Sequence, residues 1–276
     1  MRRRVFEKHS AFLCAGIISL MPSRERTFRT EAIVLRRKDF GEADRILTLF
    51  TPELGKIRAL AKGIRKPASR KAGHLELYTR SKLLVAKGRD MDIVTQAETV
   101  EPYRPLREDL LRSSYGSYCV DLIDKFTPDD YENLPLYDLL ARALDWLCES
   151  TDLQLTTRYY ELQLLGMSGY QPELFHCVVK GEEIVAEDQF FNPAEGGVIC
   201  PRCGENHPQG GAFPISLNAL KVLRFMQNNS YESLRELKLS VTVHQELERV
   251  MQRAINFHLE RQLKSAEFVR LVRRIG

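Results

Sequence analysis

Three of the six cysteines in the chain have a spacing that suggests chemistry. Cys200 and Cys203 form a Cys-x-x-Cys pair, in which Pro201 and Gly204 predict a tight knuckle that lets both sulfurs face one ion. Cys177 precedes this pair in the same stretch. A secreted disulfide scaffold would be shorter and denser in cysteine, so the pattern favours a reduced protein.

A basic stretch at residues 55–75 suggests a second chemistry. It contains seven lysine and arginine residues and no acidic residue. They are Lys56, Arg58, Lys62, Arg65, Lys66, Arg70 and Lys71. A cationic face that continues into a flexible loop suits the phosphodiester backbone, because affinity comes from counterion release. Ser69 and amides near Gly63 could add phosphate hydrogen bonds, and Phe40 and Tyr78 could stack on unpaired bases. The alternative is a solvated loop with both aromatic residues in the core. The basic C-terminal tail, with Arg270, Arg273 and Arg274, is the reserve candidate for the DNA site.

Charge is distributed unevenly along the chain, although the formal net charge is only +4. Residues 22–104 carry +8, residues 105–172 carry −7, residues 173–212 carry −5 and residues 213–276 carry +5. A basic front followed by an acidic middle favours a nucleic acid or another anionic surface as the partner of the front. Chance segregation of surface charge is the alternative.

The common catalytic motifs are absent from the sequence. There is no Gly-x-x-x-x-Gly-Lys-Ser/Thr loop, no Gly-x-Ser-x-Gly elbow and no His-Glu-x-x-His zinc helix. The six histidines are scattered, and the acid pair at Asp129 and Asp130 is typical of a solvated loop. A nuclease would need carboxylates that converge on a metal, which one sequence does not reveal. We therefore expect a protein that is not an enzyme, with an enzyme as the rival class.

The elements that must position the basic stretch are short strands. From residue 28 to residue 101 the apolar side chains recur with a period of two. The predicted strands are 32–35, 45–50, 56–62, 75–86 and 91–100. Five short strands in a segment of this length are typical of a small closed barrel, and the OB-fold is the leading candidate.

Helices are predicted after residue 105, where the apolar period changes to 3.6. The expected helices are 106–126, 136–147, 153–167, 216–227 and a long amphipathic helix that includes residues 243–257. Residues 173–212, which hold the three clustered cysteines, read as irregular. The predicted fold class is therefore α+β, with several domains. We expect an OB-fold domain at 22–104, a helical domain in two parts at 105–172 and 213–276, and a small insert at 173–212.

Residues 1–21 stand apart from this pattern. Four basic residues precede the apolar run 11–21, which imitates a signal peptide and is too short to cross a bilayer. No small-x-small cleavage site follows, so we expect an extra leader that is disordered or not translated, with Met21 as the natural start. The expected location is cytoplasmic, with no membrane partner.

Two regions of the sequence resemble the RecO family of bacterial DNA-repair mediators. The first comprises Glu31–Leu35, Gly41–Thr51, Gly55-Lys56 and Ala61–Lys66. The second begins with Gly169-Tyr170-x-Pro172-x-Leu174, leads to Cys177, and continues from Phe191 to the Cys200-x-x-Cys203-Gly204 knuckle. The resemblance covers residues 24–260 in the right order and omits residues 1–20.

The resemblance implies a DNA-repair and recombination mediator without catalytic groups. Such a protein would bind single- and double-stranded DNA, anneal complementary strands and work with RecR to load the recombinase onto DNA coated by single-strand-binding protein. It would associate with the nucleoid. An apolar groove on the helical domain would capture the acidic C-terminal tail of single-strand-binding protein, with cations such as Lys221 and Arg224. The alternative function is an RNA-binding OB-fold protein.

The resemblance also implies that the insert at 173–212 is zinc-ribbon-like, similar to a zinc finger, and holds a structural zinc ion. Here the sequence departs from the family pattern of two Cys-x-x-Cys pairs. Lys180 stands where the fourth thiolate belongs, and an ammonium group is no zinc ligand at neutral pH. His207 or His176 could complete a Cys₃His site with Cys177, Cys200 and Cys203. We favour His207, because it extends the intact pair. The alternative is a decayed site with three free thiols, in which aromatic residues hold the loop. These are Phe190, Phe191 and Phe213.

Overall fold

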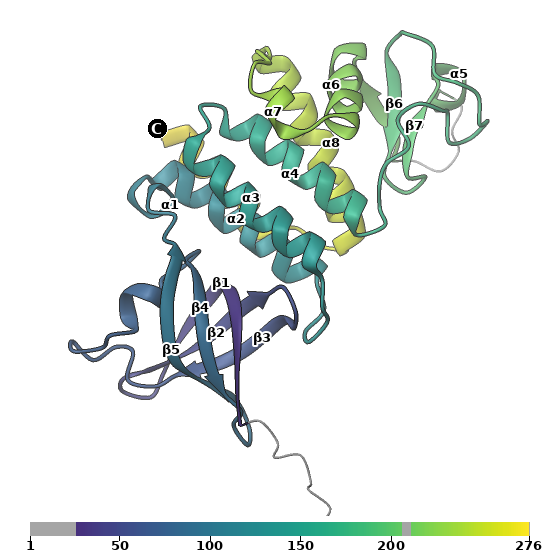
Figure 1. Ribbon diagram of the computed structural model, residues 1–276. Helices are drawn as coiled ribbons and strands as arrows, with labels where there is room; N and C mark the ends of the chain where they lie inside the picture. Colours follow the sequence, from purple (N-terminus) through teal and green to yellow (C-terminus); the bar gives the residue numbers. More distant parts are fainter. Residues whose placement is uncertain (1–25, 206–210, 276) are drawn as a thin grey trace, which may run out of the picture.

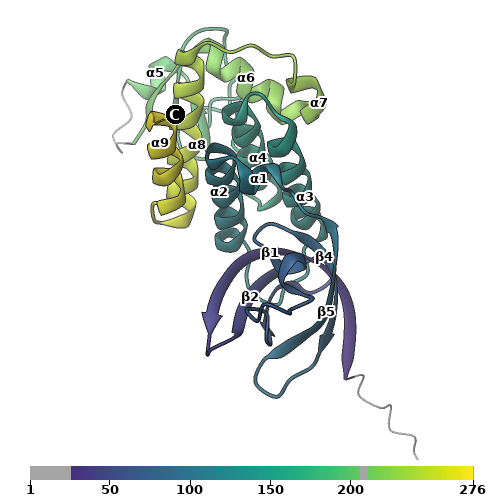
Figure 2. The same cartoon turned by 90° about the vertical axis from the view of Figure 1, so that its left-hand side faces the viewer.

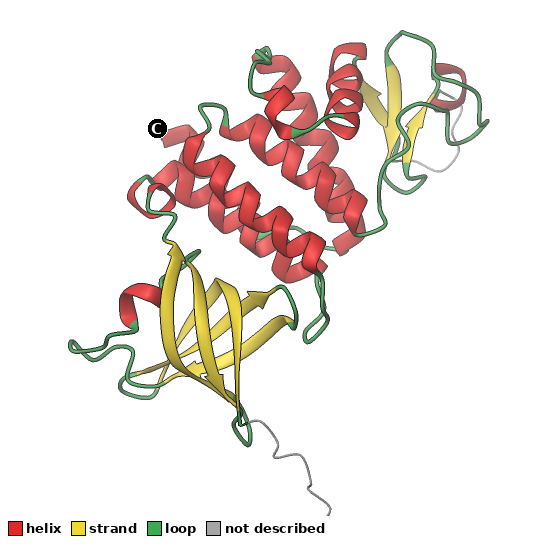
Figure 3. Cartoon of the chain, viewed as in Figure 1, coloured by secondary structure: helices red, strands yellow, loops and turns green. Residues whose placement is uncertain are grey.

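A β-barrel and a body of helices make up most of the described chain. The computed structural model describes residues 26–205 and 211–275. A five-stranded barrel comes first, the helices follow, and a small three-stranded sheet lies at the end of the helical body remote from the barrel (Figures 1 and 3). This is the predicted α+β architecture with an OB-like barrel. The predicted leader, residues 1–21, lies outside the described residues.

The barrel closes as the period-two pattern predicts. Its strands are β1 (Thr27–Phe40), β2 (Asp44–Thr51), β3 (Gly55–Ala61), β4 (Arg80–Ala86) and β5 (Asp92–Glu101). They are joined in the order β1-β2-β3-β5-β4, with a short parallel contact between β3 and β5. Because side chains alternate along each strand, apolar residues such as Val34, Leu49 and Ala59 fill the interior. The other face of β1 and β2 carries Ile33, Leu35 and Phe50, which are buried in the core of the helical body.

Two parts of the barrel differ from the prediction. β1 spans Thr27–Phe40 and is far longer than the predicted strand 32–35. The register of its pairing shifts between Val34 and Arg36, and the strand bends at this point. Its first half pairs with β4 and its second half with β2. The predicted strand 75–86 is wrong at its start, where η1 (Ala72–Leu75) precedes β4. Tyr78 has a left-handed backbone with φ +69°, which interrupts any strand at this point.

Helices make up the second body. They are α1 (Pro105–Glu108), α2 (Leu110–Phe126), α3 (Leu134–Glu149), α4 (Leu153–Met167), α6 (Leu217–Asn228), α7 (Tyr231–Leu234), α8 (Val241–Leu259) and α9 (Lys264–Ile275). The predicted helix 106–126 is divided at Asp109, whose carboxylate accepts the Arg112 N–H at 2.7 Å and caps α2. None of the described helices is long and apolar enough to cross a membrane.

The insert between α4 and α6 contains a sheet that the sequence did not predict. Its strands are β6 (Gln189–Asn192), β7 (Gly197–Ile199) and β8 (Phe213–Ile215), and α5 (Pro201–Gly204) forms the cysteine knuckle. The strand order is β7-β6-β8, and the rings of Phe191 and Phe213 meet across the sheet at 5.8 Å. Strands of three or four residues are too short to show a period, so the prediction of an irregular segment is wrong here.

The last helix, α9, lies against α2 (Figure 2). Val269 and Val272 face inward, and Arg273 forms an ion pair with Glu248 of α8 at 2.7 Å. The outer side of α9 exposes Phe268 and Leu271. This helix therefore closes the helical body on the side of α2.

Candidate nucleic-acid surface and metal centre

The basic loop, defined as residues 62–71, is fixed to the β1–β2 hairpin. β3 ends at Ala61, and Gly63 turns the chain with φ +65°, a conformation that favours glycine. The Gly63 N–H donates to a carboxylate oxygen of Asp44 at 2.7 Å. The Arg65 N–H donates to the carbonyl oxygen of Ala43 at 2.9 Å. These two bonds hold the start of the loop beside the hairpin turn.

Four cations of the basic loop reach solvent. Lys62, Arg65, Lys66 and Arg70 are exposed. Asp39 is the carboxylate that pairs with one of them, since it lies 3.5 Å from the Arg65 guanidinium and also accepts a hydrogen bond from Arg45 at 2.8 Å. The hydrogen bond from Arg45 and the charge of Arg65 hold the pKa of Asp39 below its usual value. The loop therefore keeps a net positive, accessible surface.

Lys71 has a structural position at the end of the basic loop. Its ammonium donates to the carbonyl oxygen of Val94 in β5 at 2.8 Å. Partial burial lowers the pKa of Lys71 by disfavouring its charged form. Lys71 thus fastens the loop to the barrel.

The two aromatic candidates differ. Phe40 is 52% exposed at the end of β1. Tyr78 is buried between the barrel and α2, where its hydroxyl lies 2.6 Å from that of Ser117 and donates to the carbonyl oxygen of Ser113 at 3.0 Å. Of the two alternatives for Tyr78, a base platform or a core residue, the structure shows the core residue. Sequence reasoning missed Lys38, an exposed cation near Phe40 that the run at residues 36–38 could have indicated.

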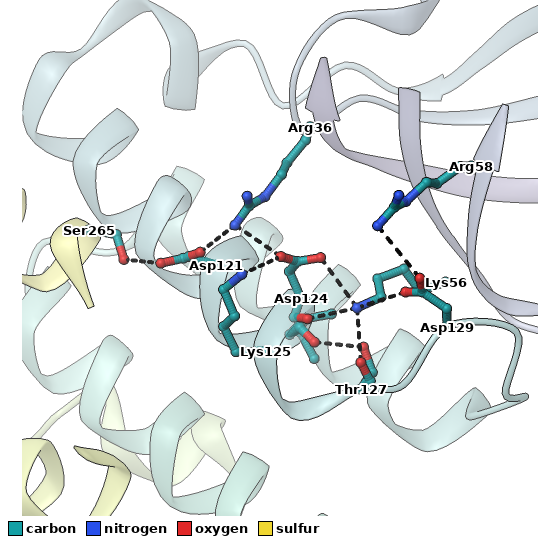
Figure 4. Close-up of polar contacts among 10 residues, drawn as sticks. Arg36, Lys56, Arg58, Asp121, Asp124, Lys125, Thr127, Asp129 and Ser265 are labelled. Atoms are coloured by element: carbon teal, nitrogen blue, oxygen red, sulfur yellow. Dashed lines mark hydrogen bonds and ion pairs between the residues drawn. The ribbon is translucent and has the colours of Figure 1, made fainter. Parts of the chain in front are cut away.

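Lys56 lies apart from the basic loop, at the joint between the barrel and the helices (Figure 4). It is only 7% exposed. Its ammonium donates to the carbonyl oxygens of Asp124 and Thr127 at 2.7 and 2.9 Å, and lies 3.1 Å from the Asp129 carboxylate. These acceptors saturate the donors of the ammonium group. The structure therefore contradicts Lys56 as a residue that contacts phosphate.

Two further barrel cations pair with the helical body at this joint. Arg36 contacts the carboxylates of Asp121 at 2.6 Å and Asp124 at 2.9 Å. Arg58 is largely exposed and lies 3.7 Å from Asp129 (Figure 4). Burial disfavours the charge of Asp124, but the hydrogen bond from Lys125 and the nearby cations outweigh it and lower the pKa of Asp124. We call this set of cations and carboxylates the joint cluster.

The three predicted cysteines meet in the insert. The sulfur atoms of Cys177, Cys200 and Cys203 all lie within 4.8 Å of one another. The Cys200 N–H points to the sulfur of Cys177 at 3.4 Å. Burial disfavours the Cys177 thiolate, but this and other backbone N–H groups outweigh burial and lower the pKa of Cys177. Three converging sulfurs fit a metal ion that takes thiolate ligands.

The surroundings of the cysteines fix the knuckle. A side chain at Gly204 would come within 2.3 Å of the Phe190 ring, so the knuckle needs glycine there. His176 is exposed and its Nδ1 lies 3.5 Å from the Glu173 carboxylate, outside the group of sulfurs. His207 lies outside the described residues. The three thiolates are thus brought together, and the fourth ligand stays a prediction.

The described architecture defines a class of protein: an OB-like barrel with a basic loop, followed by a helical body with an insert in which three cysteines converge. Two family models match the chain. Recombination protein O N terminal matches residues 25–103, and Recombination protein O C terminal matches residues 107–267. The chain belongs to the RecO family of DNA repair proteins.

Curated relatives support this assignment. A DNA repair protein RecO from Dehalococcoides mccartyi is 39% identical over 243 residues, which cover 88% of this chain and 95% of the relative. The protein of the same name from Roseiflexus sp. is 38% identical over 252 residues, covering 91% and 88% of the two chains. That of Symbiobacterium thermophilum is 34% identical over 249 residues, covering 89% and 98%.

Proposed function

We propose that this protein binds single- and double-stranded DNA through the basic loop and anneals complementary strands. With RecR, it would help to load the recombinase onto DNA coated by single-strand-binding protein. The observation that carries the proposal is the set of four exposed cations fixed beside the β1–β2 hairpin. They are Lys62, Arg65, Lys66 and Arg70. Neutralisation of phosphates lets two strands approach each other, and base pairing then supplies the specificity, so no catalytic group is needed.

A strand-annealing assay tests this function. Complementary labelled strands are mixed with the full chain, bare or coated with single-strand-binding protein, at low salt. We expect the protein to accelerate annealing in both cases, and the Lys62→Ala/Lys66→Ala/Arg70→Ala variant to lose most of the acceleration. The matched control removes three exposed cations elsewhere, as Arg104→Ala/Arg142→Ala/Lys238→Ala. No acceleration by the wild-type protein would contradict the proposal, and matched RNA strands test the RNA-binding alternative.

The metal centre is proposed to hold a structural zinc ion. Cys177, Cys200 and Cys203 would supply three thiolates and His207 the fourth ligand, with His176 as the alternative. When bound, zinc would fasten the knuckle to the sheet of the insert and, with four protein ligands, would leave no open position for catalysis. Metal analysis of protein purified without chelator tests this: we expect about one zinc per chain, and less than about one-tenth would contradict it. Loss of zinc in His207→Ala with retention in His176→Ala would identify the fourth ligand.

The acidic tail of single-strand-binding protein is proposed to bind a groove between α2, α8 and α9. The groove has a volume of about 730 Å³ and combines apolar residues such as Leu110 and Ile275 with Arg270 and Arg274. Its lining also includes carboxylates, of which Glu248 is paired with Arg273 and Asp152 lies beside His244. This arrangement suits a peptide with both apolar and acidic side chains. Arg224 is less suited, because it donates to the Leu174 carbonyl oxygen at 2.8 Å and covers the Phe175 ring.

Calorimetry with an acidic tail peptide tests the groove. We expect the Arg270→Ala/Arg274→Ala variant to lose binding heat, whereas Lys221→Ala keeps it. Binding that depends on Lys221 and not on the two arginines would contradict the groove.

A further inference from the structure

We propose that the outer side of α8 is a second binding surface for single-stranded DNA. This surface, called the α8 ridge below, consists of Arg249, Arg253 and Phe257 together with Tyr170, which follows α4. The inference rests on the proposed DNA-binding function and adds a place for a second strand.

The α8 ridge follows from the spacing of its residues. Arg249, Arg253 and Phe257 recur every four residues, which places them on one side of a helix, and all three are exposed. The opposite side of α8 is buried, with residues such as Leu247 and Val250. The helix is therefore held by its apolar face and presents a charged and aromatic stripe outward.

The two arginines are held in place without a carboxylate partner. The guanidinium carbon of Arg253 lies 4.2 Å from the centroid of the Phe213 ring, and that of Arg249 lies 5.4 Å from it. Arg249 also donates to the Pro214 carbonyl oxygen at 2.7 Å. In residues 26–205 and 211–275, no carboxylate forms an ion pair with either arginine. Stacking on a ring orients a guanidinium but leaves its N–H donors for a phosphate.

The nearby carboxylates on α8 contact groups other than the two arginines. Glu246 accepts a hydrogen bond from the Ser216 hydroxyl at 2.5 Å. Glu248 forms its ion pair with Arg273 at 2.7 Å. Neither acid therefore offsets the positive charge of the ridge by pairing with it.

The aromatic end of the ridge offers open ring faces. Tyr170 is 46% exposed and stacks on His258, with ring centroids 4.2 Å apart and planes 25° from parallel. Phe126 contacts Tyr170 edge-on at 6.4 Å. Phe257 is 49% exposed and meets the edge of His258 at 5.3 Å. Rings that are fixed by their neighbours and half open to solvent are suited to stacking with unpaired bases.

Single-stranded DNA fits both halves of the ridge. A peptide of acidic residues alone would use the arginines and leave the rings uncovered, and a duplex keeps its bases stacked inside. Only a single strand presents phosphates and free base faces together. α8 belongs to the helical body, apart from the barrel that carries the basic loop (Figure 1). One molecule could thus hold two strands and raise their effective concentration for annealing.

The test compares binding of a labelled single strand and of the matching duplex, measured by fluorescence anisotropy on the full chain. The ridge variant is Tyr170→Ala/Phe257→Ala, and the control is Phe268→Ala, an aromatic on α9 that is 42% exposed. Each is made in the wild-type protein and in the Lys62→Ala/Lys66→Ala/Arg70→Ala background. Thermal midpoints verify that the variants fold, and Phe257→Leu is a milder substitution that keeps apolar area but removes the ring.

We expect the ridge variant to bind the single strand about fivefold or more weakly, the low end of the effect of one stacked base, in both backgrounds. Duplex binding and the control should not change. Unchanged binding of the single strand, or equal losses for single strand and duplex, would overturn the inference. A basic-loop variant that binds like the wild type would instead overturn the proposed function, while the ridge comparison would still stand.

Discussion

Two regions of the barrel use the same kind of side chain in opposite ways. In the joint cluster, Lys56 is buried and surrounded by oxygen atoms from α2 and the turn that follows it. A few residues later, Lys62 and Lys66 in the basic loop are exposed, and neither has an ion pair within the described residues. Charge in the sequence therefore does not by itself indicate a ligand site. Lys56 is surrounded by oxygen atoms of the protein itself, whereas Lys62 and Lys66 leave their charge open to a ligand.

This difference separates stability from binding. Charges of the joint cluster hold the barrel against the helical body, and removing one leaves its buried partners without compensation. Charges of the basic loop are solvated, so removing them costs little stability but removes attraction for phosphates. The predictions below address the two regions separately, beginning with the largest expected effect.

Lys56→Met is expected to destabilise the fold most. The substitution keeps the apolar stem but leaves the Asp124 and Thr127 carbonyl oxygens without the ammonium donor and removes one of the cations around the Asp124 carboxylate. We expect the free energy of unfolding, measured with urea, to fall by about 3 kcal/mol. The matched variant Lys62→Met should stay within about 0.5 kcal/mol of the wild type. Equal effects of the two substitutions would remove the distinction between the regions.

Acid should weaken the joint cluster through Asp124. Its pKa is lower in the folded chain than its ordinary value of 3.8, so the folded state favours the ionised carboxylate. The stability it contributes is complete above that value and is lost as the pH falls through the lower, folded-state pKa. The difference in unfolding free energy between the wild type and Asp124→Asn should therefore shrink as the pH falls below about 4. A difference that grows on acidification would contradict the assigned role of Asp124.

Asp129→Asn is expected to have the smallest effect. Asp129 is half exposed and lies 3.1 Å from the Lys56 ammonium and 3.7 Å from Arg58. Solvent screens both contacts and Lys56 keeps its two carbonyl acceptors, so the substitution should cost less than about 1 kcal/mol. It releases Arg58 and removes one negative charge near the barrel, so DNA affinity should rise about twofold at low salt and return to the wild-type value at high salt. Weaker DNA binding by this variant would contradict the view that the joint carboxylates compete with phosphate.

The barrel could be predicted from the sequence because its strands alternate apolar and polar residues. The small sheet of the insert was not, since β7 and β8 have three residues each and show no period. The bend in β1 was also missed, because it depends on β1 pairing with two different strands. Local patterns therefore predicted the elements, while pairing between distant segments decided their lengths.

The candidate sites show the same limit. The spacing predicted that the sulfurs of Cys200 and Cys203 face one ion, because the knuckle is a local feature. The family resemblance implied Cys177, which comes from an earlier segment, and the three sulfurs do converge. Lys56 is buried because Asp124 and Thr127, from a distant part of the chain, bind its ammonium group. Tyr78 is likewise buried by α2. No pattern around either residue reveals such a contact. The run of lysine and arginine residues could therefore locate a basic surface, but it could not show which of these residues are exposed and which are buried.

The salt dependence of DNA binding tests the central claim most directly. The dissociation constant for a single strand is measured over a range of salt concentrations for the wild type, for Lys62→Ala/Lys66→Ala/Arg70→Ala and for Arg104→Ala/Arg142→Ala/Lys238→Ala. Each lost phosphate contact should reduce the slope of log K against log salt by about 0.7, so the basic-loop variant should lose about two units. The control variant should keep the wild-type slope. An unchanged slope in the basic-loop variant would contradict the claim that this loop binds the DNA backbone.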